Sequence, residues 1–404
     1  MEEVSAESNI TTGSGFKKIH QEATTMDSLP REIALNILSR LPITSLIHVK
    51  SVCLSWRSLA QDPLLATMHF SRMVKTTNPC LILHYDLPIE NHLYSLHFSD
   101  HGSIETTTRI HIPMISEFDI VGSCNGLLCL WHSLYKDECY IYSPFTRYYI
   151  KLPEAKQFQT PKRVALGFGF HPKTKEYKVV RIVYYKKEDG EVDNPQLRRY
   201  LLPESEVQVL TLGNGSLNWR IKGKTSYQLL GMSSGVLVNG RLHWLTCRHR
   251  YQSLRTLISF DLEDEKFREV PVPSRESFGR HCSRLVILKG CLSAVNQGFR
   301  SLYIWVMKEY GVKESWIKEF SIGASIPRDL YYHPEQSIQN FSQARVLCVL
   351  SNGEILLQYY CRSLVSYEPN SGTFKELGIR CLPESFNAVV HIASLNWIDT
   401  PVDL

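Results

Sequence analysis

The pattern of apolar positions divides the chain into a short helical part and a long part of alternating character. Residues 1–25 are rich in Glu, Ser, Thr and Gly and have no periodic apolar pattern, so we predict a disordered tail there. From Asp27 onward, apolar residues recur at every fourth position, which places them on one face of a helix. These residues are Leu29, Ile33, Ile37 and Leu41, with Leu38 beside them.

Capping residues set the limits expected for this first helix. Ser28 is a plausible N-cap, and Pro30 falls in the first turn, where its missing N–H does no harm. Pro42 ends the helix, because proline cannot continue the hydrogen-bond ladder.

Two further short helices follow. Thr44 or Ser45 can cap the second helix, and the third ends before Asp62-Pro63. The apolar residues of these helices are Leu46, Val49, Val52, Trp56, Leu59 and Ala60. A unit of three or four short helices in about 40 residues is marginal on its own, so a partner that covers its remaining apolar face would stabilise it.

After residue 78 the helical period gives way to strands that alternate with tight turns. Four segments share the order apolar strand, glycine turn, apolar strand, and Asn-Gly suits a two-residue hairpin turn because both positions need positive φ. The segments are Ile120–Trp131 around Asn125-Gly126, Val236–Leu245 around Asn239-Gly240, Leu285–Val295 around Lys289-Gly290, and Val346–Tyr359 around Asn352-Gly353.

Each of these hairpins is followed by a second one, which makes a four-stranded unit. The second hairpins are Tyr140–Leu152, Ile258–Val270, Tyr303–Ile322 and Val365–Ile379. A fifth unit fits less neatly, with Val164–Tyr185 as its inner pair and Val207–Ile221 as its outer pair. Repeated four-stranded units that bury their faces against their neighbours are typical of a β-propeller.

The two ends of this β-rich part lack complete units. Leu81–Tyr85 and Leu93–Ile112 come first, and Val389–Trp397 comes last. Together they can form one more blade that closes the ring and removes exposed sheet edges. We therefore predict a multidomain protein, with a tail at 1–25, a small all-α unit at 26–72, and an all-β propeller of about six blades at 79–400; a seventh blade is the alternative.

Composition narrows the class of protein. The chain has 404 residues, 43% of them hydrophobic, and 45 basic against 40 acidic residues give a net charge of only +5. This small charge predicts neither a nucleic-acid nor a membrane partner. No apolar run approaches the roughly 18–20 residues that a membrane span needs, and the acidic start, Met1-Glu2-Glu3, is unlike a signal peptide. Eleven cysteines without close pairs favour reduced thiols, so we expect a cytoplasmic and/or nuclear protein.

The sequence favours neither a metal site nor a catalytic centre. Cys124 and Cys129 lie on a predicted hairpin, and Cys247-Arg248-His249 has no matching second pair of ligands, so structural thiols are the simpler interpretation. Gly167-Phe168-Gly169 lacks the third glycine of a dinucleotide fingerprint. His243 is better explained as a strand residue than as a catalytic base. We expect no cofactor, no metal and no catalytic residue.

Three segments are weak candidates for a target-binding surface. The most basic loop begins Arg248-His249-Arg250-Tyr251, and a solvated loop is its simpler interpretation. The inserts Lys186–Pro203 and Pro327–Phe341 exceed ordinary hairpin lengths, and long loops on a rigid scaffold often carry recognition.

The helical part resembles a plant F-box. The matching residues are Leu29-Pro30-Arg31-Glu32-Ile33, Leu41-Pro42 and Val52-Cys53-Leu54-Ser55-Trp56-Arg57-Ser58-Leu59. Two departures are visible, His48 where an Arg is usual and Leu54 where a basic residue is usual, and we expect neither to touch the apolar face.

The remainder resembles the F-box-associated domain of the same plant family, often labelled F-box/kelch-repeat proteins. That family includes pollen S-locus F-box proteins, which recognise pistil ribonucleases, and regulators of plant immune receptors. The matching stretches are Gly122–Leu128, Gly167–Pro172, Tyr177–Val180, Asn239–Trp244, Phe260–Leu262 and, most specifically, Ile304–Trp316.

The resemblance implies the substrate-recognition subunit of a Skp–cullin–F-box ubiquitin ligase. The F-box would bind a Skp-family adaptor, which bridges to a cullin carrying a RING protein, and the propeller would bind a target of unknown identity for ubiquitination. The implied adaptor-binding residues are Leu29, Pro30, Ile33, Ile37, Leu38, Leu41, Pro42, Leu46, Val49, Val52, Trp56 and Leu59. Alternatively, several of these residues hold the helices together and never meet a partner. Leu29, Pro30 and Pro42, at the element ends, are the strongest candidates for direct contact.

Two functions remain open at this point. The first is the ligase receptor, which has no catalytic chemistry of its own. The second is an interaction scaffold, or an inhibitor of its partner, whose F-box serves another complex or has lost adaptor binding.

Overall fold

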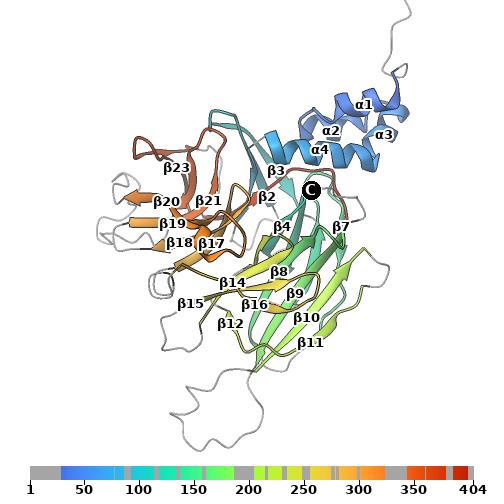
Figure 1. Ribbon diagram of the computed structural model, residues 1–404. Coiled ribbons are helices and arrows are strands. Elements are labelled where there is room, and N and C mark those ends of the chain that lie inside the picture. Colours follow the sequence, from blue (N-terminus) through green and yellow to red (C-terminus); the bar gives the residue numbers. More distant parts are fainter. Residues whose placement is uncertain are drawn as a thin grey trace, which may run out of the picture.

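A computed structural model places four helices before a ring of β-sheets (Figure 1). The structure describes residues 29–76, 78–85, 92–112, 118–132, 137–156, 161–185, 204–213, 217–229, 234–247, 255–273, 278, 282–297, 301–323, 344–359, 361–378 and 385–398.

Four helices form the helical unit, residues 29–76. They are α1 (Arg31–Leu38), α2 (Ile43–Val49), α3 (Leu54–Ala60) and α4 (Pro63–Thr76). Apolar residues on the inner faces of all four helices are buried and build a small core. In α1 the buried residues are Ala34, Leu35 and Leu38, whereas Ile33 and Ile37 of the four-residue spacing lie on the exposed face.

Prolines start the first two helices, in a way that differs from the predicted caps. Pro30 and Pro42 are the N-cap residues, with ψ of 139° and 148°, and neither makes a side-chain capping bond. Because this extended backbone cannot be part of a helical turn, α1 begins after Pro30 rather than including it. For the same reason Thr44 and Ser45 lie inside the first turn of α2 instead of capping it. Ser28 lies outside the described residues.

Six antiparallel sheets form the ring, and each has four strands in its main path. The first three complete blades in chain order are β4 (Asp119–Cys124), β5 (Leu127–His132), β6 (Glu138–Tyr142), β7 (Tyr149–Lys151); β8 (Pro161–His171), β9 (Glu176–Tyr185), β10 (Glu204–Leu212), β11 (Arg220–Gly223); and β13 (Val236–Val238), β14 (Arg241–Cys247), β15 (Arg255–Asp261), β16 (Phe267–Glu269). The short strand β12 (Gln228–Leu229) also pairs with β14.

Two more complete blades follow. They are β17 (Cys282–Leu288), β18 (Cys291–Gln297), β19 (Ser301–Met307), β20 (Trp316–Gly323); and β21 (Ala344–Val349), β22 (Ile355–Tyr359), β23 (Ser363–Glu368), β24 (Thr373–Glu376). A short 3₁₀ turn, η2 (Lys313–Ser315), precedes β20. These blades confirm the predicted repeat of two hairpins per unit.

The remaining blade is built from both ends of the propeller, as predicted. It contains β1 (Cys80–Tyr85), β2 (His92–Phe98) and β3 (Ile104–His111), and β25 (Phe386–His391) adds to it from the C-terminal side. The register of β25 on β1 runs from Cys80 opposite His391 to Tyr85 opposite Phe386. This pairing closes the ring, so the count of six blades is confirmed.

The first strand of each complete blade, together with β25, faces a central channel. Neighbouring inner strands contact one another in the order β25, β4, β8, β13, β17, β21 and back to β25. Because every blade repeats the same path, the hairpin turns between first and second strands lie together at one end of the channel, here called the turn end.

Three of the four predicted two-residue turns have the expected backbone. Both turn residues have positive φ at Asn125-Gly126, Asn239-Gly240 and Lys289-Gly290. At the fourth turn only Gly353 does, because Leu350 and Glu354 close a longer loop with a 2.8 Å backbone hydrogen bond. Gly126 has a second constraint, since a Cβ there would lie 2.4 Å from the Ser394 Cβ.

The helical unit packs on the turn end of the propeller, over the blades that contain β1 and β4 (Figure 1). Leu35, Leu38 and Leu46 belong to the same buried cluster as Ile82 and Leu128, so no solvent layer separates the two parts. Further along α4, Phe70 joins a second cluster between neighbouring blades. The two parts therefore share one continuous core.

Candidate functional site

One face of α1 stays exposed while the other is buried. Ala34, Leu35 and Leu38 point into the core, whereas Ile33 and Ile37, one turn apart, are 49% and 41% exposed. Leu29 and Pro30 are also exposed directly before the helix, Leu29 by 38%. We call Leu29, Pro30, Ile33 and Ile37 the apolar ridge. A packed helix of a monomer normally turns its polar side outward, so this ridge is suited to a protein partner.

The twelve residues implied by the resemblance fall into three classes of burial. The exposed residues are Leu29, Pro30, Ile33, Ile37, Pro42 and Val52. The residues that are half-buried against the shared core are Leu41, Trp56 and Leu59. The residues that are fully buried in this core are Leu38, Leu46 and Val49. The last three match the alternative in which a residue holds the helices together. Val52 lies beyond the end of α2, and its side chain is 62% exposed.

Leu54, which departs from the family pattern, is the most exposed large apolar residue among those that the structure describes, at 79%. It opens α3, where Cys53 caps the helix by accepting a hydrogen bond from the Trp56 backbone N–H at 3.5 Å. The sequence signal was present, because an apolar residue stands where the family has a basic one. Leu64, 47% exposed in α4, carried no such signal.

Specific contacts fix the helical unit on the propeller. The Lys50 ammonium lies 5.8 Å from the centre of the Tyr148 ring, and burial lowers the pKa of Lys50. Within the unit, the buried His69 ring lies 3.2 Å from the Leu41 carbonyl oxygen, and burial lowers its pKa to about 4 despite that hydrogen bond. His69 is therefore neutral at physiological pH and acts as a packed donor.

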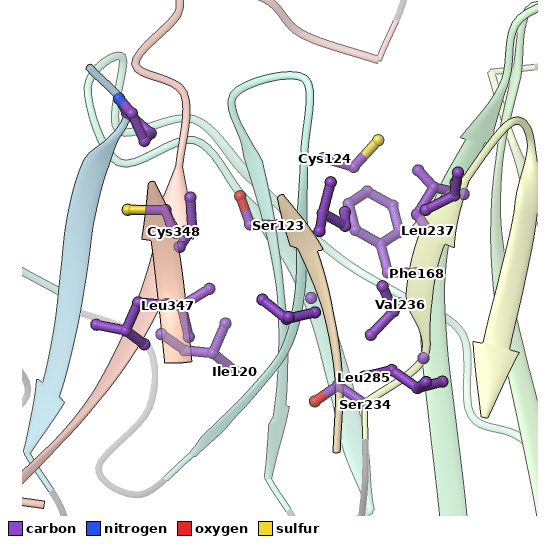
Figure 2. A pocket seen from close by; sticks show the side chains of 18 of the residues that line it. Ile120, Ser123, Cys124, Phe168, Ser234, Val236, Leu237, Leu285, Leu347 and Cys348 are labelled. Carbon is purple, nitrogen blue, oxygen red and sulfur yellow. The ribbon is translucent and has the colours of Figure 1, made fainter. Parts of the chain in front are cut away.

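The central channel has a cavity volume of about 1090 Å³. Figure 2 shows side chains from β4, β8, β13, β17 and β21 around it, among them Ile120, Phe168, Val236, Leu285 and Leu347. Phe70, Met73 and Val74 of α4 line its turn end, so the helical unit covers part of that mouth. Among the described residues of its lining, Arg284, Arg345 and Lys289 are the Arg and Lys residues and Asp119 is the one acidic residue.

The buried thiols are poor nucleophiles. Burial raises the pKa of Cys124, Cys282 and Cys348 to about 12 in each case. Cys129 and Cys139 lie with their sulfur atoms 3.7 Å apart, and burial followed by the neighbouring thiol raises the pKa of Cys129. These groups contribute packing rather than reactivity.

His243 lies on β14 as predicted and is fully buried. Its Nδ1 lies 3.0 Å from the Val236 carbonyl oxygen and its Nε2 lies 2.7 Å from the Tyr310 hydroxyl. Burial lowers its pKa to about 4. A neutral ring held from both sides fits a structural role.

The part of the chain that the structure describes contains no group of three or more His, Cys, Asp or Glu residues arranged to hold a metal ion. It also contains no helix long and apolar enough to cross a bilayer. The predicted target-binding candidates lie outside the described residues, which lack 186–203, 248–254 and 324–343. These candidates are Arg248, His249, Arg250 and Tyr251 and the segments Lys186–Pro203 and Pro327–Phe341.

Two family models match the chain in the order of its two parts. Residues 26–71 match the F-box-like model, and residues 80–396 match the F-box associated beta propeller domain. The second match covers the six-bladed ring from its first strand to the segment after β25.

Curated relatives from Arabidopsis thaliana match over most of their length. F-box protein At3g07870 is 46% identical over 397 residues, 94% of each chain. F-box protein CPR1 is 27% identical, over 92% of this chain and 89% of its own. F-box/kelch-repeat protein At3g23880 is 29% identical, over 73% of this chain and 79% of its own. The chain therefore belongs to the family of plant F-box proteins with an F-box associated β-propeller domain.

Proposed function

We propose that the protein is the substrate-recognition subunit of a Skp–cullin–F-box ubiquitin ligase. The helical unit binds a Skp-family adaptor, the adaptor bridges to a cullin and its RING protein, and the propeller binds a target protein. The chain supplies no catalytic group, because raising the local concentration of target lysines near the ubiquitin-loaded enzyme requires none. We place this function in the cytoplasm and/or nucleus, with reduced cysteines.

The observation that carries the proposal is the apolar ridge. Leu29, Ile33 and Ile37 stay exposed although the opposite face of α1 is buried in the shared core. Apolar burial gives about 25 cal/mol per Å², so covering such a ridge with an adaptor groove contributes favourably before the costs of association. An amphipathic helix that lays its apolar face in a groove is a common mode of recognition.

The first prediction concerns the ridge. The double variant Ile33→Glu/Ile37→Glu should weaken binding of a Skp-family adaptor by about a hundredfold or more, because two buried isoleucines are lost and two charges must be desolvated. The measurement is the dissociation constant of the purified full chain for the adaptor. Glutamate is a good helix former, so α1 should stay folded.

A matched control is Ile317→Glu, which replaces a similarly exposed isoleucine, 44%, on β20 of the propeller. This control should bind the adaptor like the wild type. Unchanged adaptor binding by the ridge variant would contradict the proposal that the ridge binds the adaptor. Trp56 is a less direct test site, because it is half-buried against the shared core and its loss would destabilise the fold.

The interaction scaffold remains the second candidate. A pull-down of adaptor and cullin together with a measurement of target ubiquitination separates the two functions. A ligase receptor should co-purify with both the adaptor and the cullin and should raise ubiquitination of the target, whereas a scaffold should not.

A further inference from the structure

Two arginines from neighbouring blades line the channel at the end away from the helical unit. Arg284 is the third residue of β17, Arg345 is the second residue of β21, and these two inner strands are in contact. Both residues line the channel. Since inner strands run toward the turn end, residues near their starts lie at the opposite end.

Neither arginine has an ion-pair or hydrogen-bond partner among the described residues. Burial first, and then the neighbouring Arg284, lower the pKa of Arg345 to about 10, and only the Cys361 thiol acts in the opposite sense. Asp119 begins β4, which lies across the ring from β17. Arg345 is half-buried and Arg284 is exposed at the mouth of the channel. Buried cations are normally paired, so the unpaired Arg345 beside a second cation leaves a place that an anion would stabilise.

The surroundings of the arginines fit an extended chain better than a small ion. The cavity of about 1090 Å³ exceeds the usual range of small-molecule sites, roughly 300–1,000 Å³. Apolar side chains line it between the polar groups, including Ile120, Leu285 and Val346. Such walls can pack against apolar side chains of a peptide, while the guanidinium groups donate hydrogen bonds to its anionic group.

The same face of the propeller carries the ends of the strands that flank the predicted target segments. β9 ends and β10 begins there, at Tyr185 and Glu204. The end of β14 and the end of β20 lie at this face too, because second and fourth strands of each blade run away from the turn end. The arginines therefore lie where a target would approach without meeting the helical unit.

We propose that Arg284 and Arg345 bind an anionic group, a carboxylate or a phosphate, on an extended segment of the target protein that enters the channel from this face. The inference rests on the proposed function, because it names the chemistry of the target that the propeller holds. Arginine pairs such groups with two parallel N–H···O bonds, which gives both affinity and orientation.

The test uses the full chain in complex with its Skp-family adaptor. Short random-sequence peptides are offered in three forms, with a free C-terminal carboxylate, with a C-terminal amide, and with an internal phosphoserine and an amide. The wild type should prefer one or both anionic forms. The double variant Arg284→Gln/Arg345→Gln should bind them at least about tenfold more weakly.

The control variant is Lys318→Gln/Lys375→Gln, which removes two positive charges from the outermost strands of the same two blades, β20 and β24. Its peptide binding should stay within about twofold of the wild type, because those lysines are exposed and screened. Equal melting temperatures of the variants show that the ring is intact.

Several outcomes would overturn the proposal. These are no preference of the wild type for either anionic form, equal losses in both double variants, and displacement of the peptides by inorganic phosphate alone at similar concentration. The peptide form that binds more weakly to the double arginine variant shows whether the arginines bind a carboxylate or a phosphate. Adaptor binding is scored in the same samples, so failure of the arginine proposal with the adaptor still bound leaves the proposed function standing.

Discussion

Glu265 shows how single residues fasten neighbouring blades together. It lies in the turn between β15 and β16, with only 5% of its side chain exposed. Its carboxylate accepts from Lys178 at 2.9 Å, Arg220 at 2.7 Å and Lys222 at 2.8 Å, all from the preceding blade. Lys178 is as buried as Glu265 and also donates to the Leu262 carbonyl oxygen at 2.6 Å.

The buried ion pair between Glu265 and Lys178 of the preceding blade leads to a prediction about stability. Glu265→Gln should lower the free energy of unfolding by about 2 kcal/mol, since Lys178 keeps its buried charge while solvent screens the more exposed Arg220 and Lys222. Urea unfolding at neutral pH measures it. The control Glu263→Gln should change the free energy of unfolding by less than about 1 kcal/mol, because its ion-pair partner Lys173 is exposed and the His171 ring lies 3.8 Å away. Equal effects of the two changes would contradict this account.

The same carboxylate predicts a dependence on pH. Burial alone raises the pKa of Glu265, but hydrogen bonds from Arg220, Lys222 and Lys178 outweigh it and lower the pKa from 4.5 to about 2. The folded state therefore binds this proton less readily than the unfolded chain. The stabilisation is complete above about pH 5 and is lost as pH falls toward about 2, so the gap between wild type and Glu265→Gln should narrow over that range. A gap that stays constant down to pH 2 would be inconsistent with the shift.

Residue types alone did not reveal which side chains meet. The alternation along β17 and β21 identified strands, but the closeness of Arg284 and Arg345 depends on which blades are neighbours and where each strand begins. Likewise, the four-residue spacing of Ile33, Ile37 and Leu41 identified an apolar face, but not that Leu38 would be buried and Ile33 exposed. Periodicity locates a face; burial depends on the propeller that packs against it.

At the scale of elements, α4 connects the helical unit to the propeller by packing against both. Its residue Phe70 is buried beside Val121 and Cys124 of β4, and Leu65 and Ala66 belong to the cluster shared with β1 and β5. A helix with one face in its own unit and another in the propeller couples their stabilities.

Phe70→Ala should therefore cost about 3–5 kcal/mol of the free energy of unfolding, the usual range for a buried phenylalanine. It should also separate a single unfolding transition into two, the helical unit unfolding first. Calorimetry and urea unfolding provide the measurement. Leu64→Ala, an exposed position on the same helix, should leave one transition. Two transitions in the wild-type protein would show that the parts are not coupled.

Elements with strong local signals were predictable. The turns at Asn125-Gly126 and Asn239-Gly240 follow from the need for positive φ, and the blade shared by β1 and β25 follows from incomplete units at the two ends. Helix starts were less predictable, because a proline in extended conformation moved the first turns of α1 and α2 past the expected caps. The length of α4 and its place on the propeller had no local signal, since they depend on contacts with distant strands.

At the scale of the whole molecule, the helical unit packs on the turn end of the propeller (Figure 1), and β9 ends and β10 begins at the opposite end. The shared core holds them in one orientation, so an adaptor on the ridge and a target at the far mouth of the channel would have a set spacing. This arrangement suits a receptor that presents a target to a separate enzyme.

Oxidative footprinting of the full chain, alone and bound to a Skp-family adaptor, tests the central claim most directly. Hydroxyl radicals modify side chains that solvent reaches, so they should modify Leu29, Ile33 and Ile37 in the free protein and modify them several-fold less in the complex. Exposed propeller residues such as Ile221 and Tyr149 should be modified equally in both samples. Undiminished modification of the three ridge residues in a stoichiometric complex would show that the adaptor binds elsewhere and would contradict the account.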